Sequence, residues 1–94
     1  MRITLKRSGG FGGIRTTVSL DLSKLAPAKG AEIRRLIQGT DFFKLPQTIH
    51  ARRPQPDRLH YELTIEDDQQ VHTVSISEEA LSPELKSLIA WVQK

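Results

Sequence analysis

The residues best suited to binding chemistry form one short segment, Ser8-Gly9-Gly10-Phe11-Gly12-Gly13. Glycine permits backbone conformations that other residues avoid, so the segment can turn sharply and approach another molecule closely. Phe11 is a large apolar side chain, which in an exposed turn costs solubility unless another molecule covers it. The residue types leave two roles open: Phe11 either anchors a partner or folds back onto its own domain.

The glycines also resemble the start of a phosphate-binding loop, but the motif is incomplete. Gly10-Phe11-Gly12 runs into Ile14-Arg15, so the third glycine of a G-x-G-x-x-G pattern is missing. A strand-like run follows where a nucleotide-binding helix would begin. The chain also lacks a P-loop lysine, and no spacing marks a nucleophile with its base. We therefore expect no catalytic residues, no enzymatic activity and no cofactor.

Three histidines invite a test for metal binding, and their spacing argues against it. His60 and His72 fall on two runs that we expect to pair as antiparallel strands. The alternation places His72 with the apolar Val74 and Ile76, whereas His60 lies among polar residues, so the two rings face opposite sides of the sheet. His50 has no spaced partner and the chain has no cysteine. We expect no metal site.

Length and composition predict one small soluble domain, residues 1–94. Charged residues stand at the N-terminus where a signal peptide needs an apolar stretch, and no run is long enough to span a membrane. We therefore expect a cytoplasmic protein with no membrane partner. The net charge is +3, but the basic residues are scattered and do not alternate with aromatic ones, so we expect no nucleic-acid partner.

The elements that must position the glycine segment follow from the hydrophobic pattern. Apolar residues alternate with polar ones in residues 1–5 and 14–22, which predicts a hairpin with residues 8–13 at its tip. Residues 58–66 and 72–77 alternate in the same way around a turn at Asp67-Asp68 and predict a second hairpin. Between the hairpins, residues 47–57 are proline-rich, polar and basic, and we expect an irregular loop.

Two helices are expected, one after each hairpin. Pro27 can open the first, and Gly39 is a plausible C-terminal stop. Ser82 is the expected N-cap of the second. Phe42, Phe43 and Leu45 are expected to pack the end of the first helix onto the sheet. The fold class is then α+β: a four-stranded antiparallel sheet in the order strand-strand-helix-strand-strand-helix, with two helices packed on one face.

Several of these motifs, in this order, resemble those of the emfourin family. They are the opening Arg-Ser-Gly-Gly-Phe-Gly-Gly-Ile, the Asp-Phe-Phe and Leu-Pro of residues 41–46, the Pro-Asp and Tyr-Glu-Leu-Thr of residues 56–64, the His-Thr-Val of residues 72–74 and the Ser-Pro-Glu-Leu of residues 82–85. The resemblance covers nearly the whole chain. Emfourins are small bacterial proteins that inhibit thermolysin-like zinc metallopeptidases such as protealysin, so the resemblance implies a protease inhibitor.

The resemblance makes Phe11 a candidate anchor, because thermolysin-like enzymes hold a bulky apolar residue just after the scissile bond. We expect the protease-binding residues to be Ser8, Gly9, Gly10, Phe11, Gly12 and Gly13, with Arg52 and Arg53 of the 47–57 loop as a second contact. The free chain is expected to be a monomer. The alternative is a small nucleic-acid-binding or adaptor module that uses the basic 47–57 loop.

Overall fold

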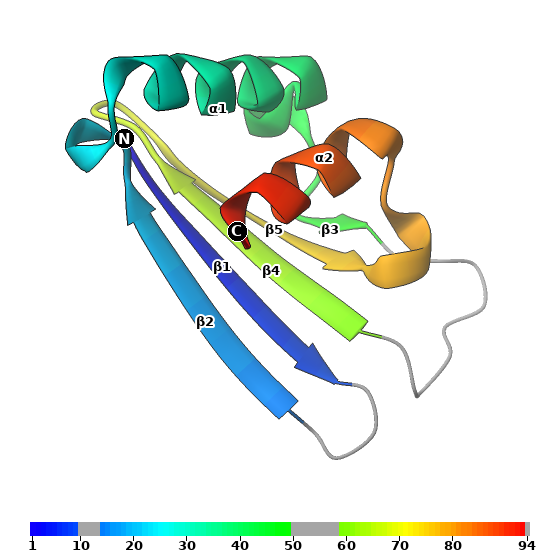
Figure 1. The fold of residues 1–94 in the computed structure, drawn as a ribbon. Coiled ribbons are helices and arrows are strands. Elements are labelled where there is room, and N and C mark those ends of the chain that lie inside the picture. The colour runs from blue at the N-terminus through cyan, green and yellow to red at the C-terminus, as the bar shows by residue number, and fades with distance from the viewer. Residues whose placement is uncertain (10–13, 50–58, 94) are drawn as a thin grey trace.

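The computed structural model describes residues 1–9, 14–49 and 59–93, which form one sheet with two α-helices (Figure 1). The sheet order is β2-β1-β4-β5-β3. The strands are β1 (Arg2–Gly9), β2 (Ile14–Asp21), β3 (Thr48–Ile49), β4 (Leu59–Glu66) and β5 (Val71–Ser77). The helices are α1 (Pro27–Thr40) and α2 (Pro83–Val92), with short 3-10 turns η1 (Leu22–Lys24), η2 (Phe42–Lys44) and η3 (Glu78–Ala80).

The predicted α+β class is confirmed, but the sheet is larger than predicted and mixed. β2, β1, β4 and β5 pair antiparallel, as the two hairpin patterns indicate. The prediction of four antiparallel strands was wrong about β3. This fifth strand pairs in parallel with β5 and lies inside the segment predicted to be irregular. Two residues are too few to show an alternating pattern, so sequence reasoning had no signal for this strand.

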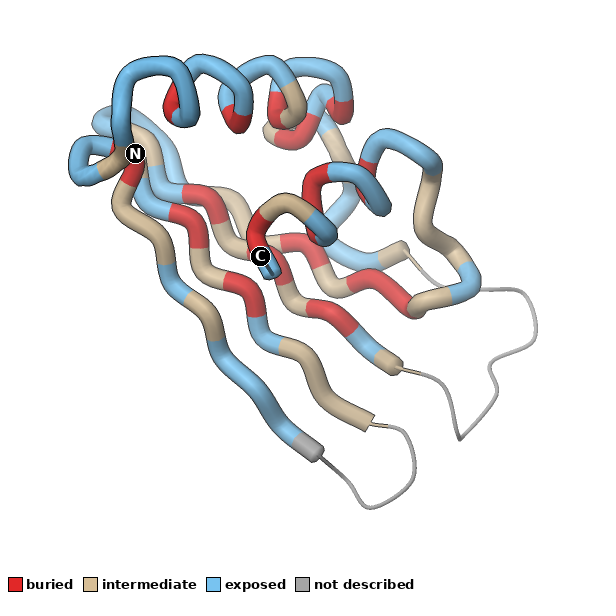
Figure 2. Tube along the Cα trace, viewed as in Figure 1, coloured by how far each residue is buried: buried red, intermediate tan, exposed pale blue. Residues whose placement is uncertain are grey.

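One face of the sheet carries the core. Ile3 and Leu5 of β1 lie opposite Ile65 and Leu63 of β4, and all four side chains are buried. Both helices cover this face, as predicted, and their buried residues belong to the same cluster (Figure 2). The helices contribute Ile33, Ile37, Leu85, Leu88, Ile89 and Val92. No helix of the described residues lies on the other face of the sheet (Figure 1).

Helix α1 begins as predicted and ends one residue later than Gly39. Pro27 occupies its first turn, where a missing N–H is no loss. The helix continues through Thr40, and Asp41 ends it in the left-handed conformation with φ 52°. The Asp41 N–H donates to the Gln38 carbonyl at 3.1 Å. Aspartate tolerates this conformation better than most residues, so Asp41 rather than glycine supplies the stop.

The residues after α1 join it to the sheet, as predicted. Phe42 is buried, and Phe43 and Leu45 are partly buried against the core. The His72 ring packs edge-on against Phe42 with ring centres 5.4 Å apart, and its Nε2 lies 2.8 Å from the Leu45 carbonyl oxygen. This arrangement gives His72 the half-buried structural role that the alternation indicated.

Helix α2 begins as predicted at Pro83, with Ser82 as its N-cap. The Leu85 N–H donates to the Ser82 hydroxyl oxygen at 3.2 Å. Its apolar stripe fully buries Leu88. Within residues 1–9, 14–49 and 59–93, no helix is both long and apolar enough to cross a membrane.

Candidate functional site

The pairing of β1 determines where the two predicted binding segments attach. Gly9, the last residue of β1, lies opposite Ile14 of β2 on one side and opposite Leu59 of β4 on the other. Three adjacent strand ends therefore flank the two segments. Gly9 and Ile14 flank residues 10–13, and Leu59 follows residues 50–58. Segments that are distant in the sequence are anchored side by side at one end of the sheet (Figure 1).

A fourth attachment point comes from β3. Thr48 and Ile49 lie beside Ser75 and Ile76 of β5. The Ser75 N–H donates to the Gln47 carbonyl at 2.8 Å, and the Ser77 hydroxyl contacts the Ile49 carbonyl at 3.4 Å. β3 runs antiparallel to β4, so the chain leaves Ile49 at the same end at which it re-enters the sheet at Leu59. The 47–57 loop thus begins on the sheet instead of being irregular throughout.

Two of the predicted site residues belong to β1. Ser8 is half-buried and lies opposite Arg15 and His60, and Gly9 completes the pairing. The prediction placed both in the hairpin tip, so the connection is shorter than expected. Gly9 has φ 99°, a conformation that residues with a Cβ rarely adopt, which explains why glycine stands there.

The remaining predicted contacts lie outside the described residues. They are Gly10, Phe11, Gly12, Gly13, Arg52 and Arg53. The structure establishes the strand ends that flank them, Gly9, Ile14, Ile49 and Leu59. Their roles in binding stay predictions.

The register adds two charged or titratable neighbours that sequence reasoning did not assign to the site. Arg15 and His60 flank Ser8 on the face of the sheet that lacks helices. They line a hollow of about 460 Å³ there, together with Lys6 and Glu62. The Lys6 ammonium lies 3.9 Å from the Glu62 carboxylate, and both side chains are largely exposed. An ion pair so exposed contributes little to stability.

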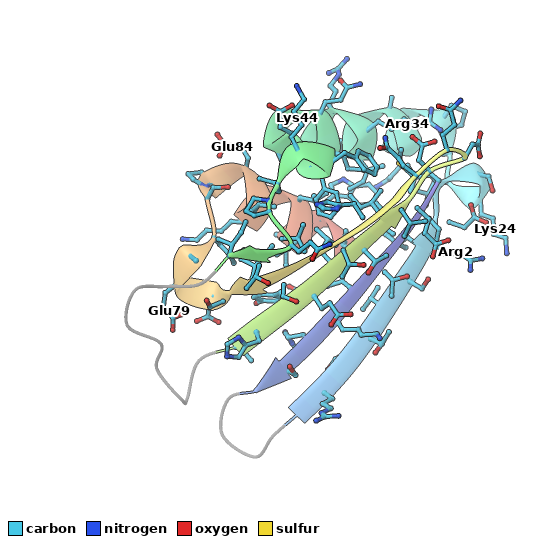
Figure 3. All side chains as sticks on the ribbon, turned by 180° about the vertical axis from the view of Figure 1, so that it is seen from behind. Arg2, Lys24, Arg34, Lys44, Glu79 and Glu84 are labelled. Carbon is cyan, nitrogen blue, oxygen red and sulfur yellow. The ribbon has the colours of Figure 1, made fainter. Side chains whose placement is uncertain are left out.

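On the helix face, Tyr61 is a nearly buried polar side chain at this end. It is 8% exposed and lies opposite Arg7. Burial raises the pKa of its hydroxyl, the negative charge of Glu78 raises it further, and the positive charge of Arg7 lowers it. Figure 3 shows the neighbouring Glu79 on η3, at the opposite end of the molecule from Arg2 and Lys24.

The described histidines do not converge. His60 lies opposite Ser77, whereas His72 lies opposite Ile65, an odd number of residues further along β4, so the rings occupy opposite faces. Across the part of the chain that the structure describes, no group of three histidine, cysteine, aspartate or glutamate residues is arranged to hold a metal ion. The strand ends at this end of the sheet flank the two predicted binding segments.

Comparison with known proteins adds one finding. The family model named Emfourin matches residues 5–93, which include both predicted binding segments and all five strands in whole or in part. No curated protein and no solved structure matches the chain.

Proposed function

The chain belongs to the Emfourin family, a family of protease inhibitors, and we propose that it inhibits a thermolysin-like zinc metallopeptidase of the protealysin type. In this proposal the segments 8–13 and 47–57 occupy the active-site cleft together. The inhibitor has no catalytic role of its own.

The observation that supports this proposal best is the double pairing of Gly9. Because Gly9 is opposite both Ile14 and Leu59, the glycine-rich connection and the end of the 47–57 loop share one rigid base. A binding segment on such a base loses less conformational freedom on complex formation than one on a free chain. Two segments side by side also suit an elongated cleft better than one alone.

Phe11 is the proposed anchor in the enzyme's pocket for a bulky apolar residue. Burying a phenylalanine contributes roughly 1.5–3 kcal/mol, whereas a nanomolar complex requires about 12 kcal/mol. The anchor therefore supplies a minor part of the binding free energy. The rest must come from a second surface, for which we propose the 47–57 loop, with Arg52 and Arg53 meeting carboxylates at the rim of the cleft.

Inhibition of this kind needs no side chain on the catalytic zinc. The chain contains no thiol, and His60 and His72 face opposite sides of the sheet. Ser8 is held within the paired part of β1, opposite Arg15 and His60. We propose that the inhibitor excludes substrate by filling the cleft and not by replacing a zinc ligand.

Titration against thermolysin and protealysin tests the proposal. Hydrolysis of a short peptide should fall as the chain is added and should reach its minimum near one inhibitor per enzyme. A serine protease assayed with its own peptide is the control and should keep its activity. Mass spectrometry of the mixture distinguishes an inhibitor, which stays intact, from a competing substrate, which is consumed. Unchanged hydrolysis by both metallopeptidases at excess inhibitor would exclude the proposed target class.

A further inference from the structure

Among the described residues, no strand pairs with the outer edge of β2. β2 is an end strand of the sheet, and all eight of its residues pair one-to-one with β1, so it contains no bulge. It also contains no proline and no lysine, the residues that most often prevent an edge from pairing with another chain. The opposite edge is different, since β3 is only two residues long.

The hydrogen-bond pattern shows which residues of β2 are available. The Leu22 N–H, directly after β2, donates to the Met1 carbonyl at 3.0 Å, in line with the β1–β2 pairing. Backbone groups alternate in direction along a strand, so the even-numbered residues of β2 face β1. The N–H and C=O groups of Arg15, Thr17, Ser19 and Asp21 therefore point away from the sheet.

We propose that two copies of the chain associate through antiparallel pairing of their β2 strands. Centred on Val18, this pairing sets Thr17 opposite Ser19 of the second copy and Arg15 opposite Asp21. The two-fold symmetry repeats each pair, so both ends of the interface carry an opposite-charge pair. Shifting the register by two residues in either direction keeps the backbone pairing but removes both charge pairs. The charges thus select one register.

Asp21 has positive charges of its own chain nearby, Arg2 opposite it on β1 and Lys24, and it keeps one oxygen for the contact with the second copy. Asp21 accepts hydrogen bonds on Oδ1 from the Ser23 hydroxyl at 2.7 Å and the Ser23 N–H at 3.0 Å, which leaves its Oδ2 available. The Ser23 hydroxyl and then its N–H lower the pKa of Asp21, so the carboxylate is charged at neutral pH. Arg15 is exposed.

The helix face of the same strand offers apolar contacts. Val18 and Leu20 are only partly buried, although they pack against the core. In the proposed register Val18 meets its own copy, and Leu20 lies opposite Thr16 of the second copy. Thr16 and Val18 line a hollow of about 300 Å³ with Leu5, Arg7 and Gln93, into which Leu20 of the second copy can extend.

On sequence alone we expect a monomer when free, and the edge of β2 leads us to propose a reversible dimer instead. Among the described strands, β2 is the one long edge strand of each chain, so the assembly closes at two copies. The axis places the two Gly9 ends at opposite ends of the joined sheet. Each copy then keeps its proposed protease-binding end accessible.

Sedimentation equilibrium of the full-length chain over a range of concentrations tests the dimer. The mass should rise from one chain to two as concentration increases. Arg15→Asp places like charges opposite each other at both ends and should weaken dimerisation at least tenfold, about 1.4 kcal/mol. Asp21→Arg should do the same. Arg34→Asp, on the exposed face of α1, is the matched control and should dimerise as the parent does.

Mixing the two single variants gives the sharpest result. In that mixture each acid faces a base, so a heterodimer should form at concentrations at which each variant alone is monomeric. Thr17→Pro is a second test, because it removes an outward N–H without removing a bond to β1, and it should also give a monomer. A parent chain that stays monomeric at every concentration would overturn the proposal, as would an unchanged dimer in Arg15→Asp. Sedimentation equilibrium measures mass and not inhibition, so the absence of a dimer would not contradict the proposed function.

Discussion

The two ends of the sheet are built for different purposes. At the end near η2, Phe42 is buried against His72, and the β4–β5 turn closes with the Asp67 N–H on the Gln70 carbonyl at 2.8 Å. At the other end the strands finish in Gly9 and in the partly buried Ile49 and Leu59. The first end is closed by packing and a turn hydrogen bond, whereas the strand ends at the second end flank the segments proposed to bind the protease. Because the chain has a phenylalanine associated with each end, Phe42 and Phe11, the same substitution by alanine can be compared between them.

The largest effect is expected from Phe42→Ala. Phe42 is 1% exposed, and removing a buried phenylalanine ring costs about 3–5 kcal/mol of unfolding free energy through lost burial and the cavity left behind. Urea unfolding should show a much lower midpoint with a similar slope. The fraction that remains folded should inhibit the enzyme with parental affinity, since η2 lies far from Gly9. Weaker inhibition by fully folded Phe42→Ala would show that the two ends are not independent.

Phe11→Ala makes the same change at the other end. If Phe11 is the anchor, the inhibition constant should rise at least tenfold, about 1.4 kcal/mol, with nearly unchanged thermal stability. The inhibition constant and the melting temperature of one preparation give both readouts. A loss of about 3–5 kcal/mol of stability would instead show that Phe11 folds into the core. Full affinity with full stability would move the binding surface to the 47–57 loop.

A smaller effect is expected from the double substitution Arg52→Ala with Arg53→Ala. Charges at the rim of an interface act mainly on encounter, so association should slow and become less sensitive to salt while dissociation changes little. Stopped-flow mixing at several ionic strengths measures both. Arg34→Ala with Arg35→Ala, on α1, is the matched control, since it also removes two exposed positive charges. An effect confined to dissociation would place these arginines within the buried interface.

The smallest effect at neutral pH is expected from Tyr61→Phe. Burial first, and then Glu78, raise the pKa of Tyr61, so the fold favours the neutral hydroxyl. The resulting stability is present below the unfolded pKa of about 10 and is lost as pH rises through the higher folded value. Tyr61→Phe should therefore unfold less readily than the parent above pH 10 and match it near pH 7. Tyr61 is the only tyrosine, so tyrosinate absorbance follows its ionisation directly. An ordinary pKa in that titration would contradict the prediction.

Sequence patterns predicted the strands and helices whose residues follow a regular period or carry a capping signal. The alternation of residues 58–66 and 72–77 identified β4 and β5 and correctly separated His60 from His72. Ser82 and Pro83 located the start of α2. These signals are local. Side-chain direction has a fixed period along a strand, and only a few residue types commonly cap the start of a helix.

What sequence could not predict depends on contacts between distant residues. The two residues of β3 have no period, and they become a strand only because β5 is beside them. The end of α1 also depends on a distant contact. The helix ends at Asp41 and not at Gly39, because Phe42 must enter the core immediately afterwards. The sequence predicted binding residues from Ser8 to Gly13 and at Arg52 and Arg53, which stays a prediction. The positions of Arg15 and His60 beside Ser8 required the register.

The pairing of Gly9 with both Ile14 and Leu59 also has a consequence for the order of folding. Ile14 is close to Gly9 in the chain, so β1 and β2 can pair early, but β4 is synthesised much later and closes a long loop when it joins β1. The base of the proposed site is incomplete until that closure. A chain still emerging from the ribosome can therefore form the β1–β2 pair that flanks residues 10–13 before β4 completes the base, and we expect binding of the proposed protease only once the sheet is finished.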